Sequence, residues 1–173
     1  MDLTFPALET LGQGRLISVY GNQNDTASFR VGWPLSHDRE GMVLSLLSPD
    51  ADYDGLRCCA AAGIYRVELD SQYLRELEAA ATHQERRRLA GDPWEGFLNY
   101  AEENKRVTQI RDFSGKRLLF GVPVAHTGDT LRILRISADG TPGKVSSVKR
   151  GRILWMVCES DTETDRQSKL QGV

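Results

Sequence analysis

Gly121–Ser160, which reads GVPVAHTGDTLRILRISADGTPGKVSSVKRGRILWMVCES, has a counterpart earlier in the chain. The stretch Gly32–Ser71, GWPLSHDREGMVLSLLSPDADYDGLRCCAAAGIYRVELDS, aligns with it without a gap. The two stretches share glycine, proline and histidine at the same spacing, in GWPLSH and GVPVAH, and they place apolar residues at matching positions. Although few residues are identical, the constant offset predicts that the chain contains two copies of one structural unit.

Each copy consists of short runs of alternating apolar and polar residues, separated by turns rich in Gly, Asp and Ser. This pattern predicts five short antiparallel strands per copy, arranged as a small barrel or sandwich. We expect Gly32 and Gly121 to permit a sharp bend in the second strand, and Pro34 and Pro123 to end its pairing. The predicted fold is mostly β with short helices: two tandem five-stranded barrels flanked by helices, over residues 1–90 and 91–173.

Three helices are expected around these strands. Asp70 or Ser71 can cap a first helix. Apolar residues at helical spacing after them predict that it runs to the Glu85–Arg88 cluster, because positive charge suits a helix C-terminus. Asp92 at the N-cap and Pro93 at the first helical position predict the start of a second helix. A third short helix is expected over Asp161–Leu170, where it would mirror the helix after Ser71.

The composition is that of an ordinary globular protein. The chain has 173 residues, of which 40% are hydrophobic and 27% are charged. No apolar run approaches the roughly 20 residues that a membrane-spanning helix needs, and the N-terminus lacks the features of a secretory signal. Its 3 cysteines, of which Cys58 and Cys59 are adjacent, do not suggest a disulfide framework. We therefore expect a cytoplasmic location and no membrane partner.

Charge is distributed unevenly between the two copies. The whole chain has a formal net charge of −2, yet residues 105–152 carry 11 basic and 3 acidic residues, a net charge of +8. The matching part of the first copy, residues 15–67, carries 5 basic and 6 acidic residues, a net charge of −1. A basic surface on one copy is typical of a protein that binds a polyanion.

The order of elements in each copy resembles the Sm-like fold, the small bent barrel of Sm and LSm proteins and of the bacterial Sm-like RNA chaperone. In the second copy, residues 107–121 are similar to the first motif of that family, where a turn glycine precedes a hydrophobic-x-Gly strand. Val148–Ile153 (VKRGRI) resembles the second motif, in which a basic residue and a glycine lie between the last two strands. The helix expected after Pro93 lies where that family has its N-terminal helix. An SH3-like tandem barrel would give a similar strand pattern.

The resemblance implies both a ligand and a mode of assembly. Sm-like proteins bind RNA through the loop after the second strand and the loop between the fourth and fifth strands. They form rings in which the fourth strand of one subunit pairs with the fifth strand of the next. Carried over to this sequence, the positions that would face RNA or another anion are His126, Lys149, Arg150 and Arg152 in the second copy and His37 in the first.

Each of these residues also has a purely structural interpretation. His37 and His126 occupy equivalent positions and could contact a ligand, but a histidine in a polar turn often bonds only to its own loop. Lys149, Arg150 and Arg152 could neutralise phosphates, or they could form a solvated turn. Trp33 and Trp155 could stack on bases, although their place in alternating strands favours packing in the core.

The sequence contains no recognisable catalytic motif and no cysteine or histidine spacing typical of a metal site. We therefore predict no enzymatic activity, no cofactor, no metal and no small-molecule substrate. The predicted function is non-catalytic binding or assembly, with a protein partner or by self-association. The alternative is RNA binding through the basic second barrel.

Overall fold

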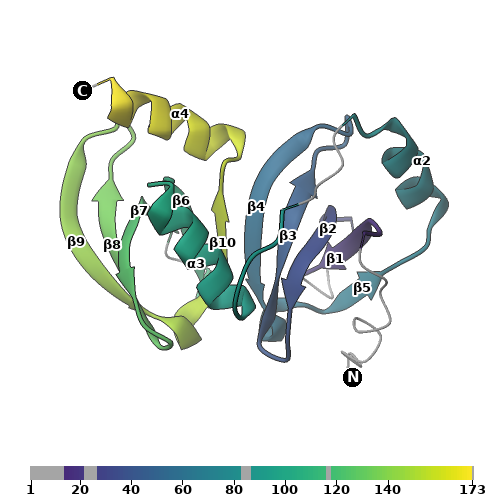
Figure 1. The fold of residues 1–173 in the computed structure, drawn as a ribbon, viewed down its shortest axis with the longest axis horizontal. Coiled ribbons are helices and arrows are strands. Elements are labelled where there is room, and N and C mark those ends of the chain that lie inside the picture. The colour runs from purple at the N-terminus through teal and green to yellow at the C-terminus, as the bar shows by residue number, and fades with distance from the viewer. Residues whose placement is uncertain (1–13, 22–26, 83–86, 116–117, 173) are drawn as a thin grey trace.

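The computed structural model describes residues 14–21, 27–82, 87–115 and 118–172. Figure 1 shows two strongly curved halves that lie side by side, the first ending with α2 and the second ending with α4. The strands of the first half are β1 (Ile17–Tyr20), β2 (Phe29–His37), β3 (Gly41–Leu47), β4 (Tyr53–Ala60) and β5 (Arg66–Glu68). Those of the second half are β6 (Thr108–Asp112), β7 (Leu118–His126), β8 (Thr130–Ile136), β9 (Pro142–Lys149) and β10 (Ile153–Cys158).

Three α-helices are described: α2 (Gln72–Ala80), α3 (Pro93–Glu103) and α4 (Asp161–Gln171). Short 3-10 turns, η1 (Ala61–Gly63) and η2 (Arg150–Arg152), connect β4 to β5 and β9 to β10. None of the described helices has the length and apolar content needed to cross a lipid bilayer.

All ten strands belong to a single antiparallel sheet, in the order β5-β1-β2-β3-β4-β10-β6-β7-β8-β9. The predicted mostly β fold with short helices is therefore confirmed, but the finer prediction of two separate barrels is not. The physical reason is that β4, the last strand of the first half in this order, pairs with β10 and continues the sheet into the second half. The sheet stays open, with β5 and β9 at its two edges.

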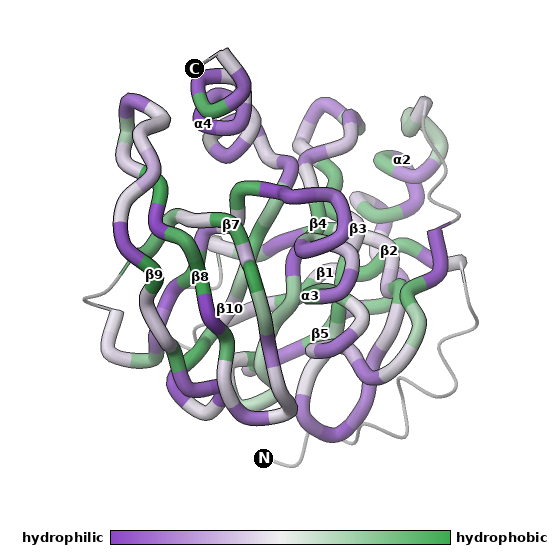
Figure 2. Tube along the Cα trace, turned by 60° about the vertical axis from the view of Figure 1, so that its left-hand side comes forward, coloured by the Kyte–Doolittle hydropathy of each residue, from purple (hydrophilic) through white to green (hydrophobic). Residues whose placement is uncertain are grey.

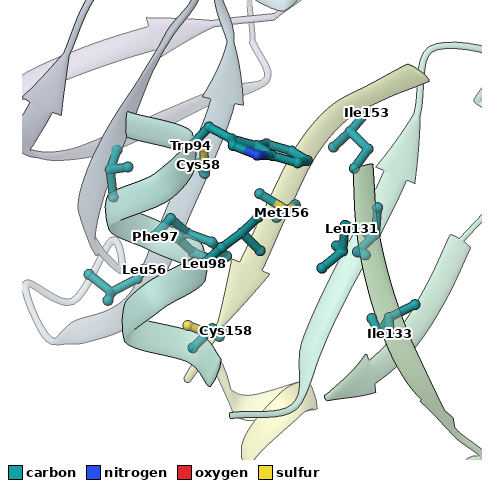
Figure 3. Close-up of a cluster of buried hydrophobic side chains, with 13 residues drawn as sticks. Leu56, Cys58, Trp94, Phe97, Leu98, Leu131, Ile133, Ile153, Met156 and Cys158 are labelled. Atoms are coloured by element: carbon teal, nitrogen blue, oxygen red, sulfur yellow. The ribbon is translucent and has the colours of Figure 1, made fainter. Parts of the chain in front are cut away.

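The main core is shared by both halves and centres on α3. Phe97 and Leu98 of α3 are fully buried, and they pack with residues of both halves. The first half contributes Val43, Leu56 and Cys58, and the second contributes Ile110, Leu131, Ile133, Ile153, Met156 and Cys158. Figure 3 shows α3 between the strands that carry Leu56 and Cys58 and those that carry Met156 and Leu131. Burying one apolar side chain of this size contributes about 1.5–3 kcal/mol, so the core binds the halves together.

The helix boundaries follow local sequence signals. The side chain of Asp92 accepts a hydrogen bond from the Glu95 amide at 2.9 Å, with Pro93 in the first turn, as predicted. Ser71 likewise caps α2 through the Leu74 amide at 3.2 Å. Leu74 and Leu77 then pack on Trp33 in the first half. Figure 2 shows α4 as a largely hydrophilic helix.

The helix after Ser71 is shorter than expected. It ends at Ala80, so the prediction that it continues to the Glu85–Arg88 cluster is wrong. Residues 83–86 of this segment lie outside the described residues. Arg87 lies in no helix, and its guanidinium interacts instead with the Glu159 carboxylate at 3.1 Å. Arg87 therefore forms a tertiary ion pair and does not stabilise the end of a helix.

Gly32 and Gly121 lie where neighbouring strands come close together. A Cβ at Gly32 would lie 2.4 Å from the carbonyl oxygen of Ser45, and one at Gly121 would lie 2.3 Å from that of Leu134. Pro34 and Pro123 lie inside β2 and β7, and the strand register shifts directly after each of them. Glycine is thus required by the close backbone approach. The prediction that each proline ends the pairing of its strand is wrong, because β2 and β7 pair again after one shift in register.

Replacing Gly121 with Ala should lower the free energy of unfolding by about 1–3 kcal/mol, because the added methyl group forces β7 away from β8. Chemical denaturation followed by circular dichroism measures this loss. Gly128→Ala is the matched control, since a Cβ there meets nothing within 4 Å. Equal stability of the two variants would contradict the close approach of the strands.

Candidate interaction surfaces

The seam between the two halves is the pairing of β4 with β10. Leu56, Arg57, Cys58 and Cys59 of β4 lie opposite Cys158, Val157, Met156 and Trp155 of β10. Because alternate residues point to opposite faces of a sheet, Cys58 and Met156 face the core around α3, while Arg57 and Trp155 face the other side. The guanidinium of Arg57 lies 4.3 Å from the ring centroid of Trp155.

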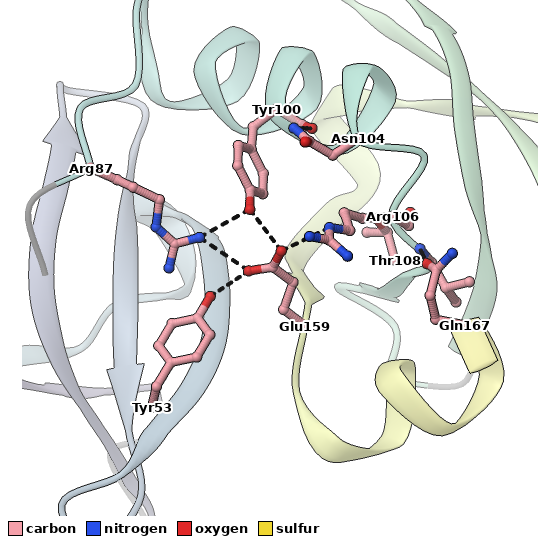
Figure 4. Close-up of polar contacts among 9 residues, drawn as sticks. Tyr53, Arg87, Tyr100, Asn104, Arg106, Thr108, Glu159 and Gln167 are labelled. Atoms are coloured by element: carbon pink, nitrogen blue, oxygen red, sulfur yellow. Dashed lines mark hydrogen bonds and ion pairs between the residues drawn. The ribbon is translucent and has the colours of Figure 1, made fainter. Parts of the chain in front are cut away.

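A second set of contacts across the seam surrounds the carboxylate of Glu159, directly after β10. Figure 4 shows this group. Tyr53 and Tyr100 donate their hydroxyls to Glu159 at 2.6 and 2.7 Å, and Arg87 donates at 3.1 Å. Nε of Arg106 lies 2.8 Å from the same carboxylate and forms an ion pair. The carboxylate thus joins β4, the segment before α3, α3 itself and the end of β10.

Glu159 is held in its ionised form by these partners. Its side chain is only 13% exposed, and this burial alone would raise its pKa. Hydrogen bonds from Tyr53, Tyr100 and Arg87 and the charge of Arg106 outweigh the burial, so the pKa of Glu159 lies below its ordinary value. Burial and the hydrogen bond to Glu159 raise the pKa of Tyr53. Glu159 also has a positive φ of 65°, a conformation that a glutamate rarely adopts.

The basic residues predicted to contact RNA each lie beside an acidic residue. Lys149 pairs with Asp129 at 2.8 Å, and Arg152 lies 3.8 Å from Asp112. Arg150 pairs with Glu40 of the first half at 2.6 Å, and its guanidinium lies 5.3 Å from the ring centroid of Trp94. The positive charge of this turn is therefore partly neutralised, and Arg150 connects the two halves.

The two histidines occupy equivalent ends of β2 and β7. His126 pairs with Leu131 in the ladder, and its Nδ1 lies 3.1 Å from the Glu102 carboxylate of α3. His37 pairs with Met42 and is partly exposed. The structure brings His126, Lys149 and Arg150 to one end of the second half, where the Arg150 amide donates to the Asp129 carbonyl at 2.8 Å. The Glu40 ion pair adds the loop after His37 to the same end.

The edges of the sheet are the other surfaces that could take part in binding. The β9 strand is largely exposed and includes Val145, whose side chain is 44% exposed. Among described residues, β9 pairs only with β8 and β5 only with β1. The Arg150 amide donates to the carbonyl of Asp129, directly before β8, and in an antiparallel ladder every second amide points to the same neighbouring strand. The amides of Ser147 and Lys149 therefore point away from the sheet.

The cysteines and the potential metal ligands form no reactive centre among the described residues. Cys58, Cys59 and Cys158 are buried free thiols. Burial raises the pKa of both Cys58 and Cys158, so these thiols stay protonated. The part of the chain that the structure describes has no group of three or more His, Cys, Asp or Glu side chains that could hold a metal ion.

Sequence reasoning did not find the Glu159 cluster. Its partners Tyr53, Arg87 and Tyr100 lie 106, 72 and 59 residues away in the sequence. No local motif links residues that far apart. The local signal nearest to this cluster is the run of charges at Glu85–Arg88, and its pattern predicts a helix end.

Comparisons with known proteins identify no relative. No family model, no curated protein and no solved structure matches this chain.

Replacing Glu159 with Gln should lower the free energy of unfolding at neutral pH by about 1–3 kcal/mol, because two partly buried arginines, Arg87 and Arg106, lose their carboxylate. Since the folded pKa of Glu159 lies below its ordinary 4.5, its ionic stabilisation is complete above pH 4.5. That stabilisation is lost as the pH falls through the folded pKa. The difference in the free energy of unfolding between the wild type and the variant should therefore be largest at neutral pH and become smaller below pH 4.5.

Denaturation series at several pH values measure this difference. Glu103→Gln, at the exposed end of α3, is the control and should cost little at any pH. A difference that is absent at neutral pH, or that grows on acidification, would contradict the role given to the carboxylate.

Proposed function

We propose that this protein is a non-catalytic assembly module, built of two copies of one Sm-like unit, that associates head to tail with further copies of itself. One observation carries the proposal: the chain already pairs the fourth strand of its first half with the fifth strand of its second half. The same two kinds of strand, β9 and β5, form the two ends of the sheet, and among the described residues each of them pairs along one edge only.

The repeated unit is supported by the matching bounds of the elements. β2, β3 and β4 begin at residues 29, 41 and 53, and β7, β8 and β9 begin at 118, 130 and 142, so each pair differs by 89. The ladder shifts register after Pro34 and after Pro123, which differ by the same number. The later shifts, between Ser45 and Leu47 and between Leu134 and Ile136, also correspond. Irregularities repeated at one offset are expected of a duplicated unit.

The offset of 89 residues and the register of the β4–β10 pairing together predict the register in which β9 of one copy would pair with β5 of the next. Cys58 lies opposite Met156 at the β4–β10 seam, so Ser147 of one copy would lie opposite Val67 of the next. β9 carries Lys144 and Lys149 and no acidic residue, whereas β5 carries one base and one acid, Arg66 and Glu68, which form an ion pair. In this register Lys144 of one copy would lie opposite Asp70 of the next, and this one pair of opposite charges favours the arrangement. Unpaired strand edges favour such pairing, since they present rows of free amides and carbonyls.

Replacing Ser147 with Pro should abolish self-association and leave the fold intact. Proline removes an amide that points away from β8, so it blocks pairing at the edge and keeps the β8–β9 ladder. Sedimentation velocity over a range of concentrations measures the oligomeric state. We expect oligomers for the wild type and for Ser147→Ala, which keeps the amide, and single chains for Ser147→Pro.

Circular dichroism verifies that the proline variant is folded. Ser146→Pro removes an amide that bonds to β8, so it should destabilise the protein itself and thereby verify the assigned direction of the amides. A wild type that remains a single chain at about 100 μM, or oligomers that persist in a folded Ser147→Pro variant, would overturn the proposal.

A further inference from the structure

A large groove opens on the side of the seam opposite α3, and neither the predicted function nor the Glu159 cluster uses it. It has a volume of about 960 Å³ and lies between β2 and β4 of the first half and β6 and β10 of the second. Arg30, Arg57 and Arg111 line it, one from each of β2, β4 and β6. The groove therefore gathers basic side chains from both halves, although the sequence suggested a basic surface on the second half alone.

These three arginines have no acidic partner among the described residues. Arg30 donates to its neighbouring Phe29 carbonyl at 3.2 Å, and Arg57 donates to the sulfur of Cys59 at 3.3 Å. Within the described part of the chain, no carboxylate lies within ion-pair distance of Arg30, Arg57 or Arg111. This distinguishes them from Lys149, Arg150 and Arg152, each of which lies beside an acid.

The positive charges of Arg30 and Arg57 in the groove repel each other. Burial and the nearby charge of Arg57 lower the pKa of Arg30, and Asp54 only partly offsets this effect. Asp54 and Asp161 also line the groove, and burial and the charge of Asp161 raise the pKa of Asp54. An anion placed between Arg30 and Arg57 would relieve the repulsion between the two guanidinium groups.

A smaller apolar hollow adjoins the arginines. It has a volume of about 200 Å³ and shares Arg30, Arg57 and Trp155 with the groove. Its other apolar lining residues include Val19, Ile64 and Leu154. A ligand that occupies both spaces would place a charged group on the arginines and an apolar group in the hollow. Aromatic rings suit such a space because they bury a large apolar area.

We propose that this groove binds an organic phosphate monoester, with its phosphate between Arg30 and Arg57 and a flat ring in the adjoining hollow. Guanidinium groups match the oxygens of phosphate through paired hydrogen bonds. Three arginines suit a dianionic phosphate better than a single carboxylate. The site is independent of the strand edges, so it does not rest on the proposed assembly.

Calorimetric titration with adenosine monophosphate, phenyl phosphate, inorganic phosphate and adenosine tests the proposal. Both esters should bind, inorganic phosphate should bind more weakly, and adenosine should not bind measurably. Tryptophan fluorescence provides a second measure, because Trp33 and Trp94 are only 3% and 4% exposed whereas Trp155 is accessible at the groove. Bound ester should therefore reduce quenching of the fluorescence by iodide.

Charge variants locate the site. Arg30→Gln, Arg57→Gln and Arg111→Gln should each weaken ester binding, the first two by about tenfold or more, as for a lost charge-assisted hydrogen bond. Arg39→Gln is the matched control, because it removes the same charge from an exposed loop and should change affinity by less than about twofold. Asp54→Asn should strengthen binding, because it removes a competing negative charge.

Four outcomes would overturn the proposal. They are no binding of either ester at about 10 mM, adenosine binding as tightly as its monophosphate, equal losses in Arg39→Gln and Arg57→Gln, and weaker binding in Asp54→Asn. Arg57→Gln could also disturb the packing of Trp155, which circular dichroism would detect. Arg111→Gln then tests the same site without touching that contact.

Discussion

The pairing of β4 with β10 is the interaction on which the rest of the structure depends. Backbone groups at a sheet edge must find partners or remain in water. Here the edge strand of each half forms hydrogen bonds with the edge strand of the other. The pairing places Cys58 and Met156 on one side, where α3 covers them, and Arg57 and Trp155 on the other, where the groove opens. The shared core, the position of Glu159 and the groove all follow from this one ladder.

Local features of the fold were readily predicted from the sequence. The start predicted at Asp92 and Pro93 is correct, and of the two caps predicted for the earlier helix, Asp70 or Ser71, the structure has Ser71. Such starts are predictable because a cap is formed by residues within one turn of each other. Alternating apolar residues gave the strands, and the turns between them gave their approximate limits. The continuity of the sheet was not predictable in this way, since Cys58 and Met156 are far apart in the chain and no spacing indicates that their strands pair.

The prediction of charged sites from the sequence has the same limit, because contacts between distant residues leave no local pattern. The basic turn at Lys149–Arg152 was found because its residues are adjacent, but Glu40, Asp112 and Asp129, which lie beside them, come from other elements. Conversely, Arg30, Arg57 and Arg111 are scattered in the sequence and only the curvature of the sheet brings them to one groove. The basic turn that the sequence indicates therefore has acidic partners. Arg30 and Arg57, which lie outside the basic segment, and Arg111, which lies inside it, have none within ion-pair distance in the described chain.

The core around α3 has a consequence for how the chain folds. Val43, Leu56 and Cys58 of the first half lose their covering if α3 detaches, and α3 itself rests on Leu131 and Met156 of the second half. Neither half therefore completes its apolar contacts before the other is in place. Folding must join segments that are distant in sequence before most of the buried area is gained, which favours slow folding and a single cooperative transition. During synthesis, the first half leaves the ribosome with an apolar face exposed until α3 and the strands after it follow.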